Sequence, residues 1–272
     1  MLVAQGLLYF PLYWLTRLFT PRPSLQAWLL LAGTFAAHLL VLRLVERRPV
    51  GDVGLGRLAA RPRLLAFGAL VGAGAIGIPC ALLLAGGELR AEAAPAGSWL
   101  AAAGALLVYL APAALWEELL VRGYPLLVLT EALGAPAAVL LTSVVFGALH
   151  LANPNASLAS AAVVTLAGVF LAAVRFATGS LWAAFATHLA WNWTLAAAVH
   201  AAVSGLPFAA PDYRVVDAGP DWLTGGAWGP EGGAAAVAGM LAAGALLWRV
   251  APRRPASLAA LFRGPGRRPS ET

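Results

Sequence analysis

The sequence predicts an all-α, polytopic membrane protein, and its composition, hydropathy and charge distribution each support this class. Of the 272 residues, 61% are hydrophobic and 11% are charged, and the mean hydropathy is +0.79. A soluble domain usually has roughly 45–50% apolar and about 25% charged residues. Twelve acidic and eighteen basic side chains are too few to cover a soluble protein of this length. The high apolar content also excludes intrinsic disorder.

Eight segments are apolar enough to be membrane helices, for which about 20 mostly apolar residues are needed. These expected spans are residues 3–19, 26–44, 64–85, 99–119, 136–151, 157–175, 181–203 and 234–250. The first lacks a basic start, so we expect a retained helix and not a signal peptide. We therefore expect one integral membrane domain over residues 1–272, a bundle of about eight helices with an intramembrane polar cavity. The basic tail 252–272 is expected to be disordered.

The distribution of arginine predicts the orientation in the membrane. Every basic side chain is Arg, and twelve of the eighteen lie in two segments, 43–63 and 249–268. The loops 86–98 and 204–233 hold six of the twelve acids and only two arginines. Because Arg collects on cytoplasmic flanks, we expect both termini in the cytoplasm and both acidic loops outside. Topology thus accounts for the net charge of +6, and no nucleic-acid partner is expected.

Adjacent carboxylates, Glu117 and Glu118, lie at the end of an apolar segment. Successive helical residues point about 100° apart, so the two carboxylates need different partners. Glu118 and Arg122 are four residues apart and share a helix face, which predicts an ion pair. Glu117 is left without a local cation, which suits a general base. The alternative is a charge cluster that only ends the helix at the membrane interface.

Two more polar pairs lie in apolar segments, and the members of each pair are one helical turn apart. Phe146 and His150 form the first pair, and His188 and Asn192 form the second. An ionisable group at membrane depth costs about 2.5–3.5 kcal/mol on insertion scales, so each is a functional hypothesis by default. The alternative for both pairs is a structural one, a packed histidine or hydrogen bonds between helices.

The other candidate side chains have simpler interpretations. His38 and His200 are expected to be packing or interfacial residues, because neither has a polar neighbour that completes a motif. Glu131 is expected on a short interfacial stretch. Cys80 is the only cysteine and lies in an apolar run, so it is expected to be buried, and a disulfide framework or a cysteine-based metal site is excluded.

Taken in order, the three clusters resemble the motifs of the CPBP family of intramembrane endopeptidases. This family includes the type II CAAX prenyl endopeptidases and the bacterial Abi-type bacteriocin-immunity proteins. Its patterns E-E-x-x-x-R, F-x-x-x-H and H-x-x-x-N are all complete here. They are formed by Glu117, Glu118, Arg122, Phe146, His150, His188 and Asn192. The resemblance covers a core of about residues 100–203 and implies a CAAX-protease-like hydrolase of prokaryotic type.

The resemblance also implies a mechanism for peptide hydrolysis. Glu117 would be the general base, and His150 would help to hold and activate the attacking water. His188 and Asn192 would donate hydrogen bonds to the developing oxyanion, and one such donor is worth roughly 2.7–4 kcal/mol. The supporting residues would be Glu118, Arg122 and Phe146.

A metal-dependent variant of the same protease is the first alternative. Glu117, His150 and His188 supply one carboxylate and two imidazoles, which is a donor set for catalytic zinc with an open fourth position. We favour a cofactor-free glutamate mechanism. The expected substrate is a peptide or a membrane-anchored protein with an apolar tail that enters from the lipid bilayer, and the expected location is the prokaryotic plasma membrane.

Two other functions remain open from the sequence. A catalytically dispensable Abi-type immunity or scaffold protein would keep the fold without the chemistry, although the complete motifs argue against decay. A small transporter or permease subunit would use buried polar residues as an ion path. Transporters often contain repeated halves, and we find no internal repeat in this sequence.

The spacing of the motifs raises a geometric problem. Glu117 lies near the cytoplasmic end of its helix, whereas a straight helix that follows would carry His150 roughly 21 Å away, to the far side. The motifs can therefore meet only if these helices are tilted, broken or re-entrant. Pro125 and Pro136 are placed to break the chain, and we expect residues 123–135 to form a short helix that dips into the membrane.

Overall fold

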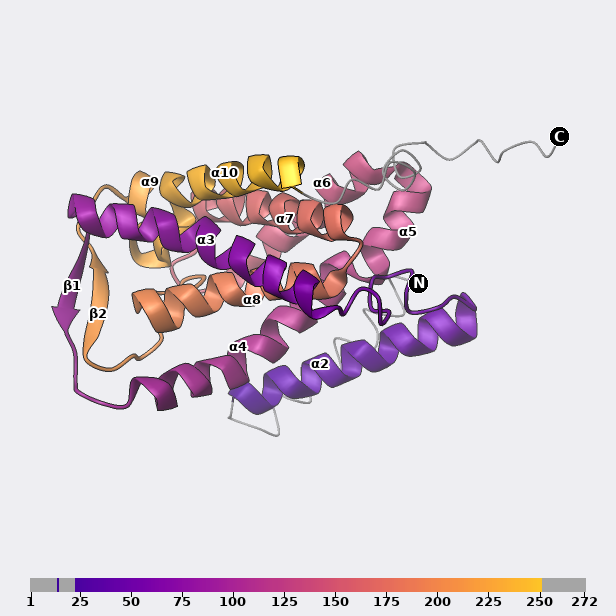
Figure 1. Ribbon diagram of the computed structural model, residues 1–272, viewed down its shortest axis with the longest axis horizontal. Helices are drawn as coiled ribbons and strands as arrows, with labels where there is room; N and C mark the ends of the chain where they lie inside the picture. The colour runs from indigo at the N-terminus through magenta and orange to yellow at the C-terminus, as the bar shows by residue number, and fades with distance from the viewer. Residues whose placement is uncertain (1–13, 15–22, 251–272) are drawn as a thin grey trace.

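The structure is a computed structural model that describes Trp14 and residues 23–250. The expected first span, 3–19, and the tail, 252–272, lie outside the described residues apart from Trp14. The helices are α2 (Pro23–Leu40), α3 (Pro62–Gly86), α4 (Trp99–Arg122), α5 (Tyr124–Leu133), α6 (Ala135–Leu149), α7 (Leu158–Thr178), α8 (Leu181–Trp193), α9 (Asp221–Thr224) and α10 (Ala234–Val250). The strands are β1 (Leu89–Ala93) and β2 (Tyr213–Asp217) (Figure 1).

The helical class and the membrane character are confirmed. Within the described residues, five helical segments are long and apolar enough to cross a membrane, and α4 together with α5 counts as one of them. Helices α8 and α10 lie at two further expected spans, but they are 13 and 17 residues long. Helix α8 is shorter than a typical span of about 20 residues, although it continues as the π-helical segment Thr194–Val199. Helix α10 is at the lower limit of about 17 residues. The count of eight spans therefore stays a prediction.

One small sheet corrects the expectation of a purely helical chain. Strands β1 and β2 pair antiparallel, with Leu89 opposite Asp217 and Ala93 opposite Tyr213. Each strand lies in one of the two acidic loops, and each satisfies backbone hydrogen bonds that the other loop leaves open. The pairing holds both acidic loops at one end of the bundle, opposite the end where the Arg-rich segment enters α3 (Figure 1).

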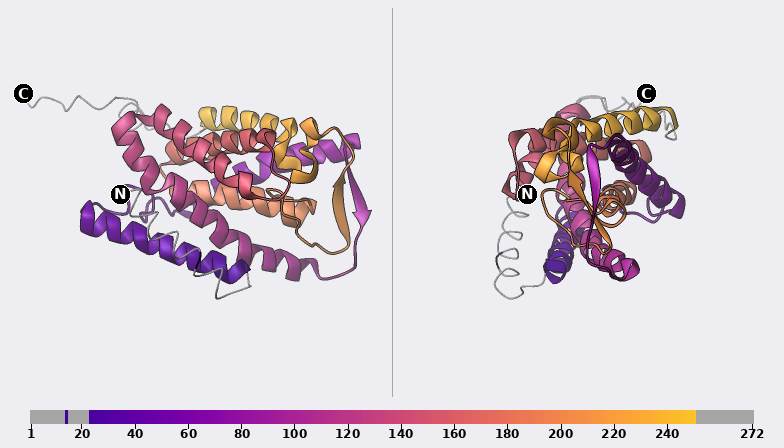
Figure 2. Two further views of the ribbon diagram at one scale, coloured as in Figure 1. Left: turned by 180° about the vertical axis from the view of Figure 1, so that it is seen from behind. Right: turned by 90° about the vertical axis from the view of Figure 1, so that its left-hand side faces the viewer.

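Helix α8 lies at the centre of the bundle, in contact with α3, α4 and α7 (Figure 2). Glycine residues allow the closest of these approaches. A Cβ atom on Gly68 would collide with the carbonyl oxygen of Ala183, and one on Gly72 with that of Thr187. Small residues spaced by four are a common interface between membrane helices because they let backbones approach closely. This contact fixes the position of α8 next to His188.

The pair α6 and α7 is packed in the same way. A Cβ atom on Gly147 of α6 would collide with the hydroxyl of Thr165, and one on Gly168 of α7 would lie 2.8 Å from the Cβ atom of Ser143. Each helix thus contributes one glycine, and each glycine leaves room for a side chain of the other helix. This packing determines where α6 presents His150, three residues beyond Gly147.

A break between α4 and α5 resolves the geometric problem of the motifs. The chain turns at Gly123, where a side chain would collide with the carbonyl oxygen of Leu119, and Pro125 lies in the first turn of α5. The ten residues of α5 climb about 15 Å, and the eleven steps from Ala135 to Phe146 return about 16 Å. Phe146 therefore lies level with the end of α4. The short helix expected at residues 123–135 is confirmed as α5 (Tyr124–Leu133), and its position in the membrane stays a prediction.

His38 of α2 stabilises the break between α4 and α5. This role goes beyond the packing or interfacial role expected from the sequence. Its ring is fully buried, and its Nδ1 donates to the carbonyl oxygen of Thr34 at 2.9 Å. A carbonyl only accepts, so Nδ1 carries the hydrogen and Nε2 has a lone pair. That nitrogen accepts the backbone N–H of Tyr124 at 3.2 Å, which caps the first turn of α5.

The Arg-rich segment packs against the outer face of α5. Arg48 donates to Glu131 at 2.7 Å and to Asp52 at 2.8 Å, and the hydroxyl of Tyr124 donates to Glu46 at 3.0 Å. The hydrogen bonds to Asp52 and Glu131 raise the pKa of Arg48 above its ordinary value. Glu131, expected at an interface, is thus an anchor between α5 and this segment.

We predict that replacing Gly72 by Ala destabilises the fold. The added methyl group would force α3 and α8 apart, and overpacking of this kind costs about 1–3 kcal/mol. Gly74→Ala on the same helix is the matched control, because nothing lies within 4 Å of its added Cβ atom. Thermal unfolding in detergent, followed by circular dichroism, should show a lower Tm for Gly72→Ala alone. Equal Tm values would contradict the proposed contact.

Candidate active site

Glu118 is the centre of a buried ionic cluster. Its Oε1 accepts from Nη1 of Arg122 at 3.0 Å, and both side chains are completely buried. The ion pair expected from their spacing is therefore confirmed. The same oxygen also accepts from Nδ1 of His188 at 3.0 Å. One carboxylate thus joins the end of α4 to the middle of α8.

The ring of His188 lies between the two adjacent carboxylates. Because Arg122 keeps Glu118 ionised, this carboxylate only accepts, and Nδ1 of His188 therefore carries a hydrogen. On the other side of the ring, Nε2 lies 3.7 Å from Oε2 of Glu117. Glu117 is the more exposed of the two, with a quarter of its side chain accessible. The two neighbouring glutamates thus have different surroundings, as the helix geometry requires.

Phe146 connects this cluster to the second motif. The guanidinium of Arg122 lies over the Phe146 ring, 4.1 Å from its centroid, in the geometry of a cation–π contact. The ring meets His150 edge to face at 4.7 Å and His188 at 6.0 Å. Phe146 is therefore the side chain through which all three motifs touch.

His150 has a fixed tautomer and a free nitrogen. Its Nδ1 donates to the carbonyl oxygen of Phe146 at 2.8 Å, so in the neutral ring Nε2 has a lone pair. His150 is only half-buried and lines a pocket. A ring held in this way can accept a hydrogen bond from a water molecule in the pocket.

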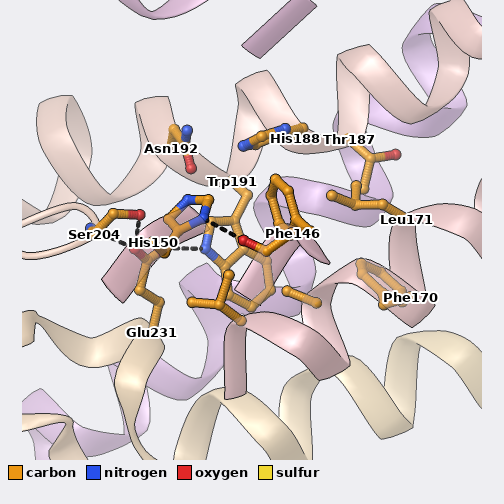
Figure 3. A pocket seen from close by; sticks show the side chains of 12 residues that line it. Phe146, His150, Phe170, Leu171, Thr187, His188, Trp191, Asn192, Ser204 and Glu231 are labelled. Carbon is orange, nitrogen blue, oxygen red and sulfur yellow. Dashed lines mark hydrogen bonds between the residues drawn. The ribbon is translucent and has the colours of Figure 1, made fainter. Parts of the chain in front are cut away.

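The pocket lies beside the second and third motifs, and Figure 3 shows the side chains around it. Polar groups come from His150, His188, Asn192, Ser204 and Glu231, and the apolar side chains include Phe146, Val164, Phe170, Leu171 and Trp191. Asn192 lies one turn beyond His188, and its amide has no hydrogen-bond partner among the described side chains. Its amide is thus free to bind a ligand.

The structure brings most of the expected site residues into contact, with one exception. Glu117 reaches His188, and His188 reaches His150 through the ring of Phe146. Within the described chain, Glu117 and His150 share no direct hydrogen bond. Glu117 is also absent from the pocket lining. Direct cooperation of these two residues therefore needs a bridging water or substrate.

Two residues at this site were not among those predicted from the sequence. Glu231 is buried and lines the pocket, and the ring of Trp228 lies 6.5 Å from that of His150. Both come from the acidic loop 204–233, far along the chain from the motifs. The loop's Gly, Pro and Trp content was visible, but no spacing connected it with the three clusters.

The expected zinc donors do not form a ready metal site. Among residues 23–250, no group of three or more His, Cys, Asp or Glu side chains is arranged to hold a metal ion. Glu117, His150 and His188 are therefore not gathered as a preformed metal site among these residues, and the zinc variant stays an alternative. The hydrogen bond from Nδ1 of His188 to Glu118 does not itself exclude a metal at Nε2, because metal-ligating histidines usually donate their other ring nitrogen to a carboxylate or carbonyl.

Comparison with known proteins gave one family. Residues 98–194 match the family described as Type II CAAX prenyl endopeptidase Rce1-like. The match contains all three motifs and the helices α4 to α8. No curated protein and no solved structure matched the sequence.

We predict that Arg122→Ala strongly destabilises the protein. The substitution leaves the Glu118 carboxylate buried without its cation, and breaking a buried ion pair in this way costs about 3–5 kcal/mol. Arg214→Ala is the control, because its ion pair with Glu92 is largely exposed and worth about 0–1 kcal/mol. Unfolding in mixed micelles measures both. Equal losses of unfolding free energy in the two variants would contradict the prediction that the buried pair stabilises the protein more than the exposed pair.

Proposed function

We propose that this chain, whose residues 98–194 match the Rce1-like type II CAAX prenyl endopeptidase family, is an intramembrane endopeptidase with Glu117 as general base. The observation that supports this most directly is the different environment of the two adjacent carboxylates. Glu118 is held by Arg122 and His188, whereas Glu117 forms no ion pair among the described residues except its contact with the ring of His188. Glu117 is therefore the carboxylate that is free to accept a proton.

Hydrolysis begins with the transfer of a proton from water to Glu117. The lone pair on Nε2 of His150 accepts the other hydrogen of that water and orients its oxygen toward the substrate carbonyl. The new C–O bond forms as the carbonyl oxygen becomes an oxyanion. The C–N bond then breaks, and the leaving nitrogen takes the proton that His188 carries at Nε2. A positioned general base contributes about 10²–10⁴-fold to such a rate.

His188 and Asn192 are the proposed oxyanion donors, and the contacts of His188 define its protonation state in that role. Because Nδ1 is used on Glu118, only an imidazolium form offers an N–H at Nε2. Glu117, Glu118 and Arg122 together have a net charge of −1, and a protonated His188 makes the cluster neutral. The same proton is available for the leaving amine.

The pocket walls indicate the kind of substrate. Val164, Phe170 and Leu171 of α7 form an apolar wall beside the polar groups, and several helices expose apolar side chains outward. We propose a peptide or membrane-anchored protein with an apolar tail that enters from the bilayer, with both termini of the enzyme in the cytoplasm. No feature of the site suggests a nucleic-acid partner.

We predict that Glu117→Gln lowers peptidase activity by at least about 100-fold and leaves Tm unchanged. The probes are quenched fluorogenic peptides that end in Cys-aliphatic-aliphatic-X, with and without a farnesyl group, given to the enzyme in proteoliposomes. Glu92→Gln is the control, because this exposed carboxylate lies in the β1–β2 ribbon. Equal activity in Glu117→Gln, or no cleavage by the parent, would contradict the proposal. Retained biological function in Glu117→Gln would favour the scaffold alternative.

Chelation distinguishes the glutamate mechanism from the zinc variant in the same assay. The parent enzyme should keep its activity after treatment with a strong chelator and removal of free metal. If the chelated enzyme is inactive and zinc restores its activity, the metal-free mechanism is wrong.

A further inference from the structure

Glu231 is a buried carboxylate that the proposed chemistry does not use. It lies in a short 3₁₀ turn, Pro230–Gly232, just before the start of α10, and it is 7% exposed. It lies outside the family match, which ends at residue 194. Among the described residues it forms no ion pair. A buried charge without a counterion needs other strong stabilisation.

Three hydrogen-bond donors supply that stabilisation. Oε2 of Glu231 accepts from the indole Nε1 of Trp191 at 2.7 Å. Oε1 accepts from the hydroxyl of Ser204 at 2.8 Å and from the backbone N–H of the same residue. Both carboxylate oxygens are therefore occupied, and hydrogen bonds of this charge-assisted kind are roughly twice as strong as neutral ones.

Trp191 is the link to the proposed site, because it lies on α8 between His188 and Asn192. Regular α-helical bonding ends just beyond it, where Thr194–Val199 form a π-helical segment. Segments of this kind are often found at functional sites. Tertiary contacts must therefore hold this end of α8 in place. One of these contacts is the hydrogen bond from the Trp191 indole to the carboxylate of Glu231. Its acceptor is charged, which makes it stronger than a hydrogen bond to a neutral carbonyl.

The same short segment also contacts the helix that bears His150. Trp228, three residues before Glu231, is buried in a cluster with Phe146 and Val164, and its ring lies 6.5 Å from that of His150. Gly229 allows the turn between them, with φ of 107°, and a Cβ atom there would collide with the carbonyl oxygen of Ala202. The segment is therefore closely packed against α6 and against the backbone at Ala202.

We propose that Glu231 is a positioning residue of the active site. Its carboxylate fixes Trp191, and through Trp191 it fixes the rotation of α8 that presents His188 and Asn192 to the pocket. The functional unit therefore extends beyond the family-matched segment to the loop before α10. The kinetic part of this inference rests on the proposed peptidase function, whereas the contact itself is testable independently.

Glu231→Gln and Trp191→Phe test the proposal in the full chain, with the fluorogenic peptides described above. A glutamine has one acceptor oxygen in place of two and turns an N–H group toward a donor, and phenylalanine removes the indole donor. Each variant should lower kcat by about 10–100-fold, since small displacements of catalytic groups have effects up to this size. KM should change less than kcat, because the apolar wall on α7 is unchanged and phenylalanine keeps an apolar ring in place of the Trp191 indole that lines the pocket.

The double variant and the pH profile separate positioning from general stability. Because both changes break one hydrogen bond, Glu231→Gln/Trp191→Phe should be no slower than the slower single variant. Glu231→Asp keeps the charge and should recover part of the activity. Glu92→Gln and Trp222→Phe, both exposed and at the same end of the bundle, are the controls and should match the parent. Additive losses, or a lower Tm with unchanged kcat per folded molecule, would overturn the proposal.

A spectroscopic readout keeps this test separate from the peptidase proposal. In protein labelled with 5-fluorotryptophan, the ¹⁹F resonance that Trp191→Phe removes belongs to Trp191. Glu231→Gln should shift that resonance, and Glu92→Gln should not. An unchanged resonance would overturn the role of Glu231 even in an active enzyme. Equal activity in Glu117→Gln together with a shifted resonance would refute the catalytic assignment and leave the contact intact.

Discussion

The shared carboxylate of Glu118 is the interaction on which the rest of the site depends. It accepts from both Arg122 and His188, and its side chain and that of Arg122 are completely buried. An ionised carboxylate in such surroundings is stable only when it is paired and hydrogen-bonded. Each of the three groups therefore requires the other two, and the cluster holds α4 and α8 in one arrangement.

The surrounding helices make that arrangement possible through close packing. Gly72 lets α3 approach α8 at Thr187, and Gly147 lets α6 approach α7 at Thr165. In a bilayer, helices gain little from hydrophobic association, so close packing and polar contacts provide the specificity. The fold thus has a rigid frame of small residues around one buried ionic cluster, and Glu117 remains accessible at its edge.

The sequence predicted the contacts that depend on helix periodicity. The pair Glu118 and Arg122 followed from a spacing of four, and a helix at α5 followed from the requirement that Glu117 and His150 approach each other. The link from His188 to Glu118 spans 70 residues, so no periodicity reveals it. It also narrows the interpretation of His188, because Nδ1 already donates to Glu118 and only Nε2 is left to reach an oxyanion.

Other features depend on contacts between segments that lack any pattern. The two acidic loops have strand pairing that neither loop shows alone, because each strand is only five residues long. Glu231 appears in the sequence as one more loop carboxylate, and its donors, Trp191 and Ser204, lie 40 and 27 residues away. Such contacts become visible only when the helices are placed in space.

The coupling between Glu118 and His188 tests the central claim most directly. Glu118→Gln, His188→Gln and the double variant form a double-mutant cycle, and the free energy of unfolding in mixed micelles is measured for all four proteins. If the shared carboxylate organises the site, the two changes are strongly non-additive, with a coupling energy of about 1–3 kcal/mol. Additivity within about 0.5 kcal/mol would contradict the account.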